Sequence, residues 1–284
     1  MHLLVRTPLL AAVALFSTTA AQAQAVRIAI MQAQAGDAEK FKPLVAYFAK
    51  SGLSASFVTA KDYPAAAAMF TRGDVDAMFA GSGIAATLMV KDLADPIARP
   101  IGRDGHSTYW AVVIGPKNGS TPFTGKADFF QGKRVAITPL ASSGEFFYRS
   151  LPGAGATKCT LVPVASHAAA LDAIMRGQAD YAIIKNRVWD SISAKFTPLA
   201  KIGEDKGGEN PDGTLMVSRR MDRASGSKLL ASLLALKADG SPEASAAKAG
   251  LGITHYVPTG KNDFQHTVGL IKKAGVTKDF PWTF

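Results

Sequence analysis

The stretches AAAAMFTRGDVDAMF (residues 65–79) and AAALDAIMRGQADYA (residues 168–182) decide the fold of this 284-residue chain. Each joins an apolar, alanine-rich segment to an Arg-Gly pair, with an aspartate, Asp76 or Asp180, at the third position after the glycine. A glycine here supplies the left-handed residue that commonly ends a helix. We therefore expect a helix, a glycine cap and a strand in both places. Because helix-to-strand connections generally use glycine, the repeat indicates two similar lobes and no shared chemistry.

The segments around the first stretch continue this alternation. Residues 26–30 are typical of a buried strand, a helix is expected to begin near Asp37, and residues 54–59 alternate as a second strand. The strand at 76–79 runs into Gly81-Ser82-Gly83, which opens a further helix. Repeated strand–helix order indicates a parallel sheet with helices on its faces.

The second half of the chain repeats the same order. Strands are expected at 132–137, 161–164 and 180–184, with helices at 145–151 and 167–176. A polar segment at 201–213 precedes a strand at 215–218 and a helix at 227–236, and the tail to Phe284 is expected to be helix and loop. The predicted architecture is an α/β fold with lobe 1 from residues 26–106 and 214–284 and lobe 2 from 107–213. Two crossings, near 104–112 and 204–215, would form a hinge suited to closure around a ligand.

The first 25 residues are typical of a cleaved secretory signal peptide. Arg6 precedes a short apolar run, and alanines 21, 23 and 25 follow in the A-x-A spacing of a cleavage site. The run is far shorter than the roughly 20 residues of a membrane-spanning helix. We expect cleavage near Ala23 or Ala25 and a periplasmic mature protein, because no cysteine follows the run to accept a lipid.

The composition is that of a globular protein, with 48% hydrophobic and 19% charged residues. The formal net charge of +10 includes Arg6, so the mature chain would carry +9. The Lys and Arg residues are scattered and no RNA-stacking motif is present, so a nucleic-acid partner is not expected. Cys159 is the single cysteine, so an intramolecular disulfide is excluded. We expect it to be either a small buried apolar residue or a reactive or metal-binding thiol.

Several stretches, in this order, resemble the phosphate, phosphite and phosphonate-binding family of type 2 periplasmic binding proteins, which serve ABC transporters. They are Phe41-Lys-Pro-Leu with Tyr47-Phe48, Lys61-Asp-Tyr63, Arg72-Gly-Asp-Val-Asp-Ala77, Gly132-Lys-Arg-Val-Ala136, Ser142-Ser-Gly144, Ser166-His-Ala-Ala-Ala170 and Gly177-Gln-Ala-Asp-Tyr181. The resemblance implies a two-lobed fold with a hinge of two crossings. It also implies a small oxyanion as ligand, an inner-membrane ABC permease as partner, and no cofactor; we further expect a monomer.

We expect a set of ligand-binding residues in the cleft, some implied by the resemblance and the others by their expected positions at strand ends or on the hinge strand. They are Tyr63, Ser82, Gly83, Tyr109, Ser142, Ser143, Gly144, His167 and Lys185. The turn at 142–144 is the best supported, because backbone N–H groups at a helix start attract anions and hydroxyls add donors. The alternative for Ser143 is a helix cap. For Tyr63 it is packing at a helix start, for Tyr109 core packing, and for His167 a surface or capping role.

The chain departs from the family pattern at two places. The family usually has an aromatic residue shortly after Gly83, whereas this chain continues Ile-Ala-Ala. Relatives also tend to place an acid that accepts from a ligand amine where Lys185 and Asn186 stand here. A Lys185 that points into the cleft would favour a fully charged anion or a carboxylate over an aminoalkylphosphonate. The alternative is a solvated lysine just beyond the strand.

Other functions remain as alternatives to transport. An enzyme is not expected, because the sequence has no G-x-S-x-G elbow, no H-E-x-x-H pair and no Walker A loop. A periplasmic sensor that presents its closed form to a histidine kinase would use the same ligand-driven closure. A third hypothesis makes Cys159 the centre of a metal or metalloid site.

Overall fold

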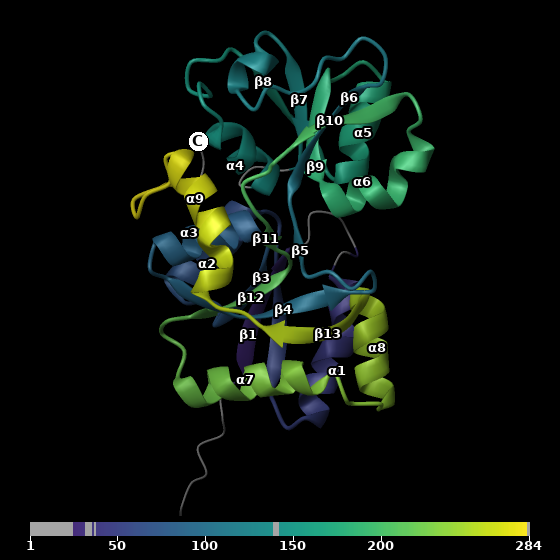
Figure 1. Cartoon of the computed structure of the whole chain (residues 1–284). Coiled ribbons are helices and arrows are strands. Elements are labelled where there is room, and N and C mark those ends of the chain that lie inside the picture. Colours follow the sequence, from purple (N-terminus) through teal and green to yellow (C-terminus); the bar gives the residue numbers. More distant parts are fainter. Residues whose placement is uncertain (1–24, 32–35, 37, 139–141, 283–284) are drawn as a thin grey trace, which may run out of the picture.

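The computed structural model describes residues 25–31, 36, 38–138 and 142–282, so the predicted signal peptide lies outside the described residues except for Ala25. Across these ranges every helix is too short or too polar to cross a membrane. Two separate sheets, covered by helices, form two lobes that are joined by two thin crossings (Figure 1). This is the two-lobed α/β architecture that the sequence predicts.

The first sheet takes its strands from both ends of the described chain. Its order is β13-β4-β12-β3-β1-β2. The strands are β1 (Val26–Met31), β2 (Ala55–Ala60), β3 (Ala77–Ala80), β4 (Ala94–Gly102), β12 (Thr214–Ser218) and β13 (Ile253–Pro258). β1 pairs in parallel with β2 and β3, whereas β12 runs antiparallel to β3 and β4.

Six helices cover the two faces of this sheet. Side chains of α2, α3 and α9 join one buried cluster, and those of α1, α7 and α8 join the other. Their bounds are α1 (Lys42–Lys50), α2 (Tyr63–Arg72), α3 (Ser82–Val90), α7 (Arg223–Ala235), α8 (Pro242–Leu251) and α9 (Gln265–Lys273). Two short 3-10 helices, η1 (Glu39–Phe41) and η4 (Lys261–Phe264), precede α1 and α9.

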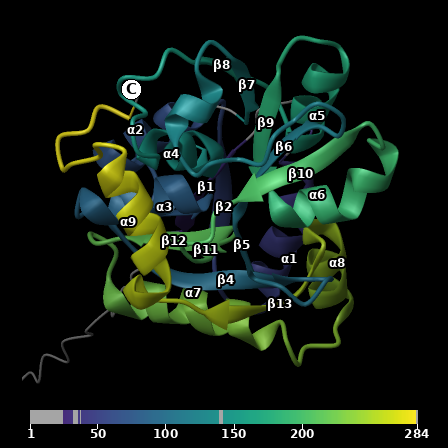
Figure 2. The same cartoon turned by 45° about the horizontal axis from the view of Figure 1, so that its top comes forward.

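The second sheet is built from one continuous part of the chain, in the order β10-β6-β9-β7-β8. Its strands are β6 (Ala111–Pro116), β7 (Arg134–Ile137), β8 (Thr160–Pro163), β9 (Tyr181–Lys185) and β10 (Leu199–Glu204). The helices are α4 (Ser143–Ser150), α5 (His167–Met175) and α6 (Asn186–Ile192), with 3-10 helices η2 (Ala127–Phe130) and η3 (Ser193–Lys195). Figure 2 shows α4 on one face of this sheet and α5 and α6 on the other, as the two buried clusters require.

The two crossings between the lobes pair with each other. β5 (Thr108–Tyr109) and β11 (Asn210–Pro211) form a short antiparallel ladder in which Asn210 faces Tyr109. Both strands fall inside the crossings expected near 104–112 and 204–215. The hinge of two crossings is therefore confirmed, while the lobe boundaries at 106/107 and 213/214 stay a prediction.

The repeated Arg-Gly and aspartate pattern has the same structural use in both lobes. Asp76 accepts hydrogen bonds from the backbone N–H (2.9 Å) and guanidinium (2.8 Å) of Arg27, whose guanidinium also donates to the carbonyl of Gly73. Asp180 binds Arg134 through the same groups, at 2.8 and 3.0 Å, and Arg134 donates to the carbonyl of Gly177. In each lobe the repeat ties a strand, β1 or β7, to the end of a later helix and to the residue before the neighbouring strand.

Strands β4, β10 and β13 are among those that the sequence patterns did not predict. β4 carries Pro96 and Pro100, which cannot donate to a ladder, yet it lies in the interior of the sheet between β12 and β13. The register shifts at Leu215/Met216 on β12 and at Ile253/His255 on β13, so the pairing on both sides of β4 is irregular. The expected helix-and-loop tail is therefore wrong at β13.

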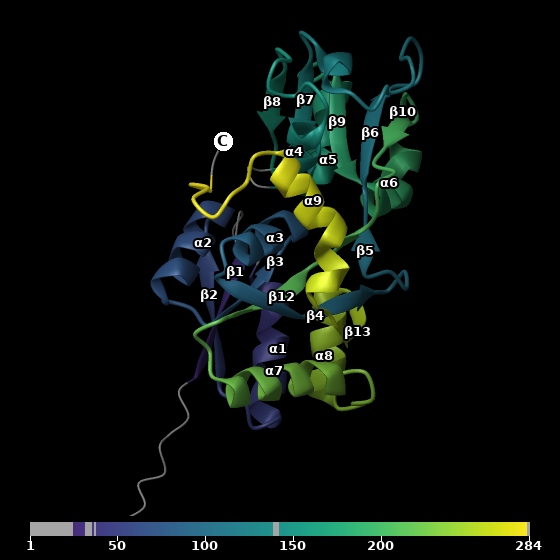
Figure 3. The ribbon, with the colours of Figure 1, turned by 60° about the vertical axis from the view of Figure 1, so that its left-hand side comes forward.

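Helix α9 of the first lobe reaches across to the second lobe and the hinge (Figure 3). It packs against α4, and Phe146 of α4 is buried in the core cluster of the first lobe. His266 Nε2 donates to Asp205 Oδ2 at 2.7 Å, and Thr267 Oγ1 donates to the Asn210 side chain at 2.8 Å. The C-terminal part of the chain thus fixes both the hinge ladder and the helix that carries the predicted anion-binding turn.

Candidate functional site

A cavity of about 420 Å³, which we call the cleft pocket, lies where the two lobes meet the hinge. Most of its walls come from the ends of strands and the starts of helices, the usual ligand position in open α/β sheets. Its lining residues are Met31, Lys40, Gly81, Ser82, Gly83, Tyr109, Thr138, Ser142, Ser143, Ala165, Ser166, His167 and Lys185. Seven of the nine predicted site residues are therefore brought together in one cavity.

The two remaining predicted residues do not line the cleft pocket as described. Gly144 is buried beside β9, and a Cβ atom at this position would lie 3.2 Å from the carbonyl oxygen of Ile183. Its role is to let α4 pack closely against the sheet. Tyr63 begins α2, but its side chain lies outside what the structure describes, so its predicted ligand contact stays a prediction.

Three helices begin at the cleft pocket. They are α3 with Gly81 as N-cap, α4 with Ser142 and α5 with Ser166. The first N–H groups of a helix lack intrahelical partners and carry the positive end of the helix dipole. One of these helices belongs to the first lobe and two to the second, so an anion between them would be attracted by both lobes.

The structure separates the roles of the two neighbouring serines. Ser142 is the helix cap: its hydroxyl accepts from the N–H of Glu145 at 3.3 Å and donates to the carbonyl of Thr138 at 3.1 Å. The alternative of a capping Ser143 is therefore wrong by one position, because Ser143 is already the first residue of α4. Ser143 lines the cleft pocket together with Tyr109.

Tyr109 of β5 lines the cleft pocket together with the anion-attracting turns of the two lobes. The tyrosine is 1% exposed, and its hydroxyl forms a hydrogen bond with the hydroxyl of Ser82. Burial raises the pKa of Tyr109, although Lys185 and the two serine hydroxyls act against the shift. The phenol stays protonated at neutral pH and ties the start of α3 to the hinge strand, while Ser143 at the start of α4 lines the same pocket.

Lys185, the last residue of β9, lines the cleft pocket. Its Nζ lies 2.5 Å from Asp212 Oδ1 and 4.3 Å from the centre of the Tyr109 ring. The interpretation as a solvated lysine is therefore wrong, since the side chain is only 23% exposed and paired. Burial alone would raise the pKa of Asp212, but Lys185 and Arg187 lower it overall and keep this carboxylate charged.

Asp212 and Lys40 are site features that the sequence patterns did not single out. Asp212 lies in the polar crossing at 201–213, where several acids and glycines give no sign of which one turns toward the cleft. Its pairing with β9 depends on the antiparallel crossing of β5 and β11. Lys40 lies on η1 and lines the pocket from the first lobe. In the sequence, only its charge and its position near a helix start could have indicated this role.

His167, the first residue of α5, faces the cleft pocket with a neutral ring. Among the described residues its Nδ1 atom has no hydrogen-bond partner, although this atom is buried. Burial lowers the pKa of His167 to about 4, with help from Lys185 and against the pull of Asp212. At neutral pH the ring therefore lines the cavity without adding a charge.

Stability should fall between pH 7.5 and pH 5 because of His167. Histidine binds a proton near pH 6.5 in the unfolded chain and near pH 4 in the folded protein, so the unfolded state holds more protons in this window. The loss amounts to about 2 kcal/mol by linkage. Urea unfolding at both pH values measures it, and His167→Gln should lose less stability than the wild type by this amount. Equal losses in the two proteins would contradict the prediction.

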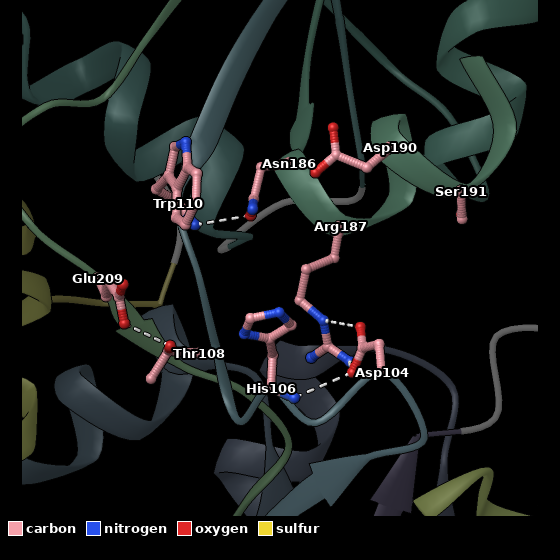
Figure 4. Close-up of a pocket in the computed structure, with 9 residues that line it drawn as sticks. All are labelled: Asp104, His106, Thr108, Trp110, Asn186, Arg187, Asp190, Ser191 and Glu209. Carbon is pink, nitrogen blue, oxygen red and sulfur yellow. Dashed lines mark hydrogen bonds and ion pairs between the residues drawn. The ribbon is translucent and has the colours of Figure 1, made fainter. Parts of the chain in front are cut away.

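A second cavity, of about 470 Å³, lies on the other side of the hinge strand (Figure 4). Thr108 and Trp110 face it, whereas Tyr109 between them faces the cleft pocket, as side chains alternate along a strand. Figure 4 shows the Arg187 guanidinium beside Asp104, at 2.7 Å. Asp104, Asp190 and Glu209 give the cavity three carboxylates against this single guanidinium. An oxyanion is repelled here, so the larger cavity is not the better anion site.

The surroundings of Cys159 do not favour the hypothesis of a metal or metalloid site at this thiol. The thiol is partly buried on the core of the second lobe, and burial raises its pKa. Metals bind the thiolate, which such a shift disfavours. Within the described ranges, no three His, Cys, Asp or Glu side chains lie together as metal ligands do.

Comparison with known protein families matches residues 28–264 to the periplasmic substrate-binding protein of phosphonate ABC transporters. The chain belongs to this family. The phosphonate-binding family consists of non-enzymatic transport components that bind a small molecule in the periplasm and work with an ABC permease. The family expected from the sequence is confirmed. None of the curated proteins compared with the chain matches it.

Solved structures of similar fold extend the comparison beyond the phosphonate-binding family. XAC2383 from Xanthomonas citri bound to ATP has a TM-score of 0.71 and 17% identity, over 88% of this chain and 96% of that chain. PhnD1 from Prochlorococcus marinus in complex with methylphosphonate has a TM-score of 0.67 and 14% identity, over 88% and 98%. An ancestral arginine-binding protein bound to arginine has a TM-score of 0.54 and 15% identity, over 79% and 96%. At such identities the likeness shows the type 2 periplasmic binding protein fold alone.

Proposed function

We propose that this protein captures a small oxyanion, of the phosphate, phosphite or phosphonate kind, by hinge closure and delivers it to an ABC importer. The observation that carries the proposal is the meeting of three helix starts, from both lobes, in the cleft pocket. Lys185 and Lys40 add positive charge, and Ser143 and His167 add uncharged donors or acceptors. Closure around β5 and β11 would bring the helix starts of the two lobes onto the same anion.

We further infer that the mature protein begins after Ala23 or Ala25 and acts in the periplasm as a monomer. The signal-like segment and the membership of a periplasmic family support export. The ligand-binding residues named above, with the exception of Tyr63 and Gly144, all line a cavity formed within one chain. A single copy therefore supplies a complete candidate site.

A thermal-shift and calorimetry screen of phosphate, phosphite, methylphosphonate and sulfate tests the proposed function. A ligand that binds only the folded state stabilises it by about 2.7 kcal/mol at a concentration of 100 Kd. For a chain of this size the melting temperature should rise by about 5–10 °C. Sodium chloride at matched ionic strength controls for screening, and arginine serves as the cationic comparison. A response to arginine and to no oxyanion would overturn the proposal.

A further inference from the structure

The ammonium group of Lys185 is held in the way that proteins hold an ammonium ligand. One side of the group meets the ring of Tyr109, at 4.3 Å from the ring centre, and another meets Asp212 Oδ1 at 2.5 Å. An aromatic face together with a carboxylate is a recurrent recognition pair for organic cations. Tyr109 is fully buried, and the Lys185 and Asp212 side chains are 23% and 24% exposed, so the arrangement is an enclosed one.

This cation lies in the same cavity as the anion-attracting helix starts. Lys185 and Tyr109 line the cleft pocket together with Ser143 and His167. The pocket thus has an end suited to an oxyanion and an adjoining subsite suited to an ammonium group. The occupant of the second subsite is a side chain of the protein itself.

We propose that Lys185 is a built-in occupant of an ammonium subsite, so that the cleft pocket accepts oxyanions without an amino group and rejects aminoalkyl oxyanions. The inference rests on the proposed oxyanion function and specifies its ligand class. An amine carried by the ligand would meet the Lys185 ammonium instead of Asp212, and like charges at contact repel. Lys185 also lines the cleft pocket, so its positive charge attracts the oxyanion.

The surroundings of Asp212 allow the lysine to be removed without losing the subsite. Arg187 Nη1 lies 3.4 Å from Asp212 Oδ2 and would remain as a counter-charge. Arg187 is itself anchored to Asp104 of the first lobe. A variant without the Lys185 side chain should therefore fold, keep a charged Asp212 and open a space between this carboxylate and the Tyr109 ring.

The test compares Lys185→Ala with Lys185→Met by calorimetry, with methylphosphonate and 2-aminoethylphosphonate as probes. We expect the wild type to bind methylphosphonate at least tenfold more tightly than the amine-bearing probe. Lys185→Ala should reverse this preference by a gain of at least tenfold for 2-aminoethylphosphonate. Lys185→Met keeps the space filled but lacks the charge, so it should lose affinity for methylphosphonate without that gain.

Propylammonium, which carries the amine but no oxyanion, tests the subsite separately. It should raise the melting temperature of Lys185→Ala and leave the wild type and Lys185→Met unchanged. If the wild type binds both phosphonates equally, or if Lys185→Ala gains affinity for neither amine, the inference is overturned while the oxyanion function stands. If the wild type binds no oxyanion at all, the proposed function fails, and the propylammonium result alone decides whether the subsite exists.

Discussion

Replacing Ser143 by aspartate is expected to weaken oxyanion binding by about 1,000-fold while the protein stays folded. Ser143 is the first residue of α4 and lines the cleft pocket, so the new carboxylate would occupy the region proposed for the ligand. Two unit charges about 4 Å apart repel by about 4 kcal/mol at an effective dielectric constant near 20. The fold tolerates the change because acids are favourable in the first turn of a helix.

Two matched variants serve as controls for Ser143→Asp. Ser143→Ala removes only a hydroxyl and should cost about tenfold in affinity, as expected for one hydrogen bond to a charged group. Ser225→Asp places the same charge in the first turn of α7, away from the cleft pocket, and should leave affinity unchanged. Calorimetry with methylphosphonate measures affinity, and thermal unfolding confirms the fold. A folded Ser143→Asp protein that binds as tightly as Ser143→Ala would contradict an anion at this helix start.

Truncating Phe146 to alanine should cost about 3–5 kcal/mol of unfolding free energy, the range for a buried phenylalanine. Phe146 belongs to α4 of the second lobe but is 1% exposed within the core cluster of the first, alongside α9 residues such as Ile271. The melting temperature should fall by about 10 °C for a chain of this size. Because the lost contact joins the two lobes, small-angle scattering of the ligand-free protein should also show a larger radius of gyration.

The next residue supplies the control for Phe146. Phe147 is 4% exposed but lies in the core of its own lobe. Phe147→Ala should destabilise the protein by a similar amount and leave the radius of gyration of the folded protein unchanged. If the two variants scatter alike below their unfolding transitions, α9 does not hold the lobes together through α4.

The elements of each lobe that were predictable are those with local signals. Strands β1, β2 and β3 lie within one residue of their predicted bounds, because the strand–helix–glycine pattern depends only on consecutive residues. β4 and β13 were missed because their pairing depends on partners far away in the sequence. Two prolines in an interior strand are tolerated only because the neighbouring strands adjust their register, which no local pattern encodes.

The candidate site also contains residues that were predictable from local sequence and residues that were not. The turns at Ser82 and Ser142–Ser143 and the helix start at His167 follow directly from strands, so their convergence was predictable from parallel topology. Asp212 was not predictable, because its place beside Lys185 is set by the antiparallel crossing of β5 and β11. The distinction between Ser142 as cap and Ser143 as pocket residue needed the backbone geometry of the turn itself.

The insertion of β12 between β3 and β4 has a consequence for the order in which the chain folds. β4 ends at Gly102 and β12 begins at Thr214, and all strands of the second sheet lie between them. The second lobe can therefore form from a continuous segment, while the first sheet must wait for a distant strand to close a long loop. Until then β3, whose four residues are all buried in the finished sheet, leaves an apolar edge open to other chains. During refolding at high protein concentration, we therefore expect aggregation to begin at this unpaired strand edge rather than at the cleft.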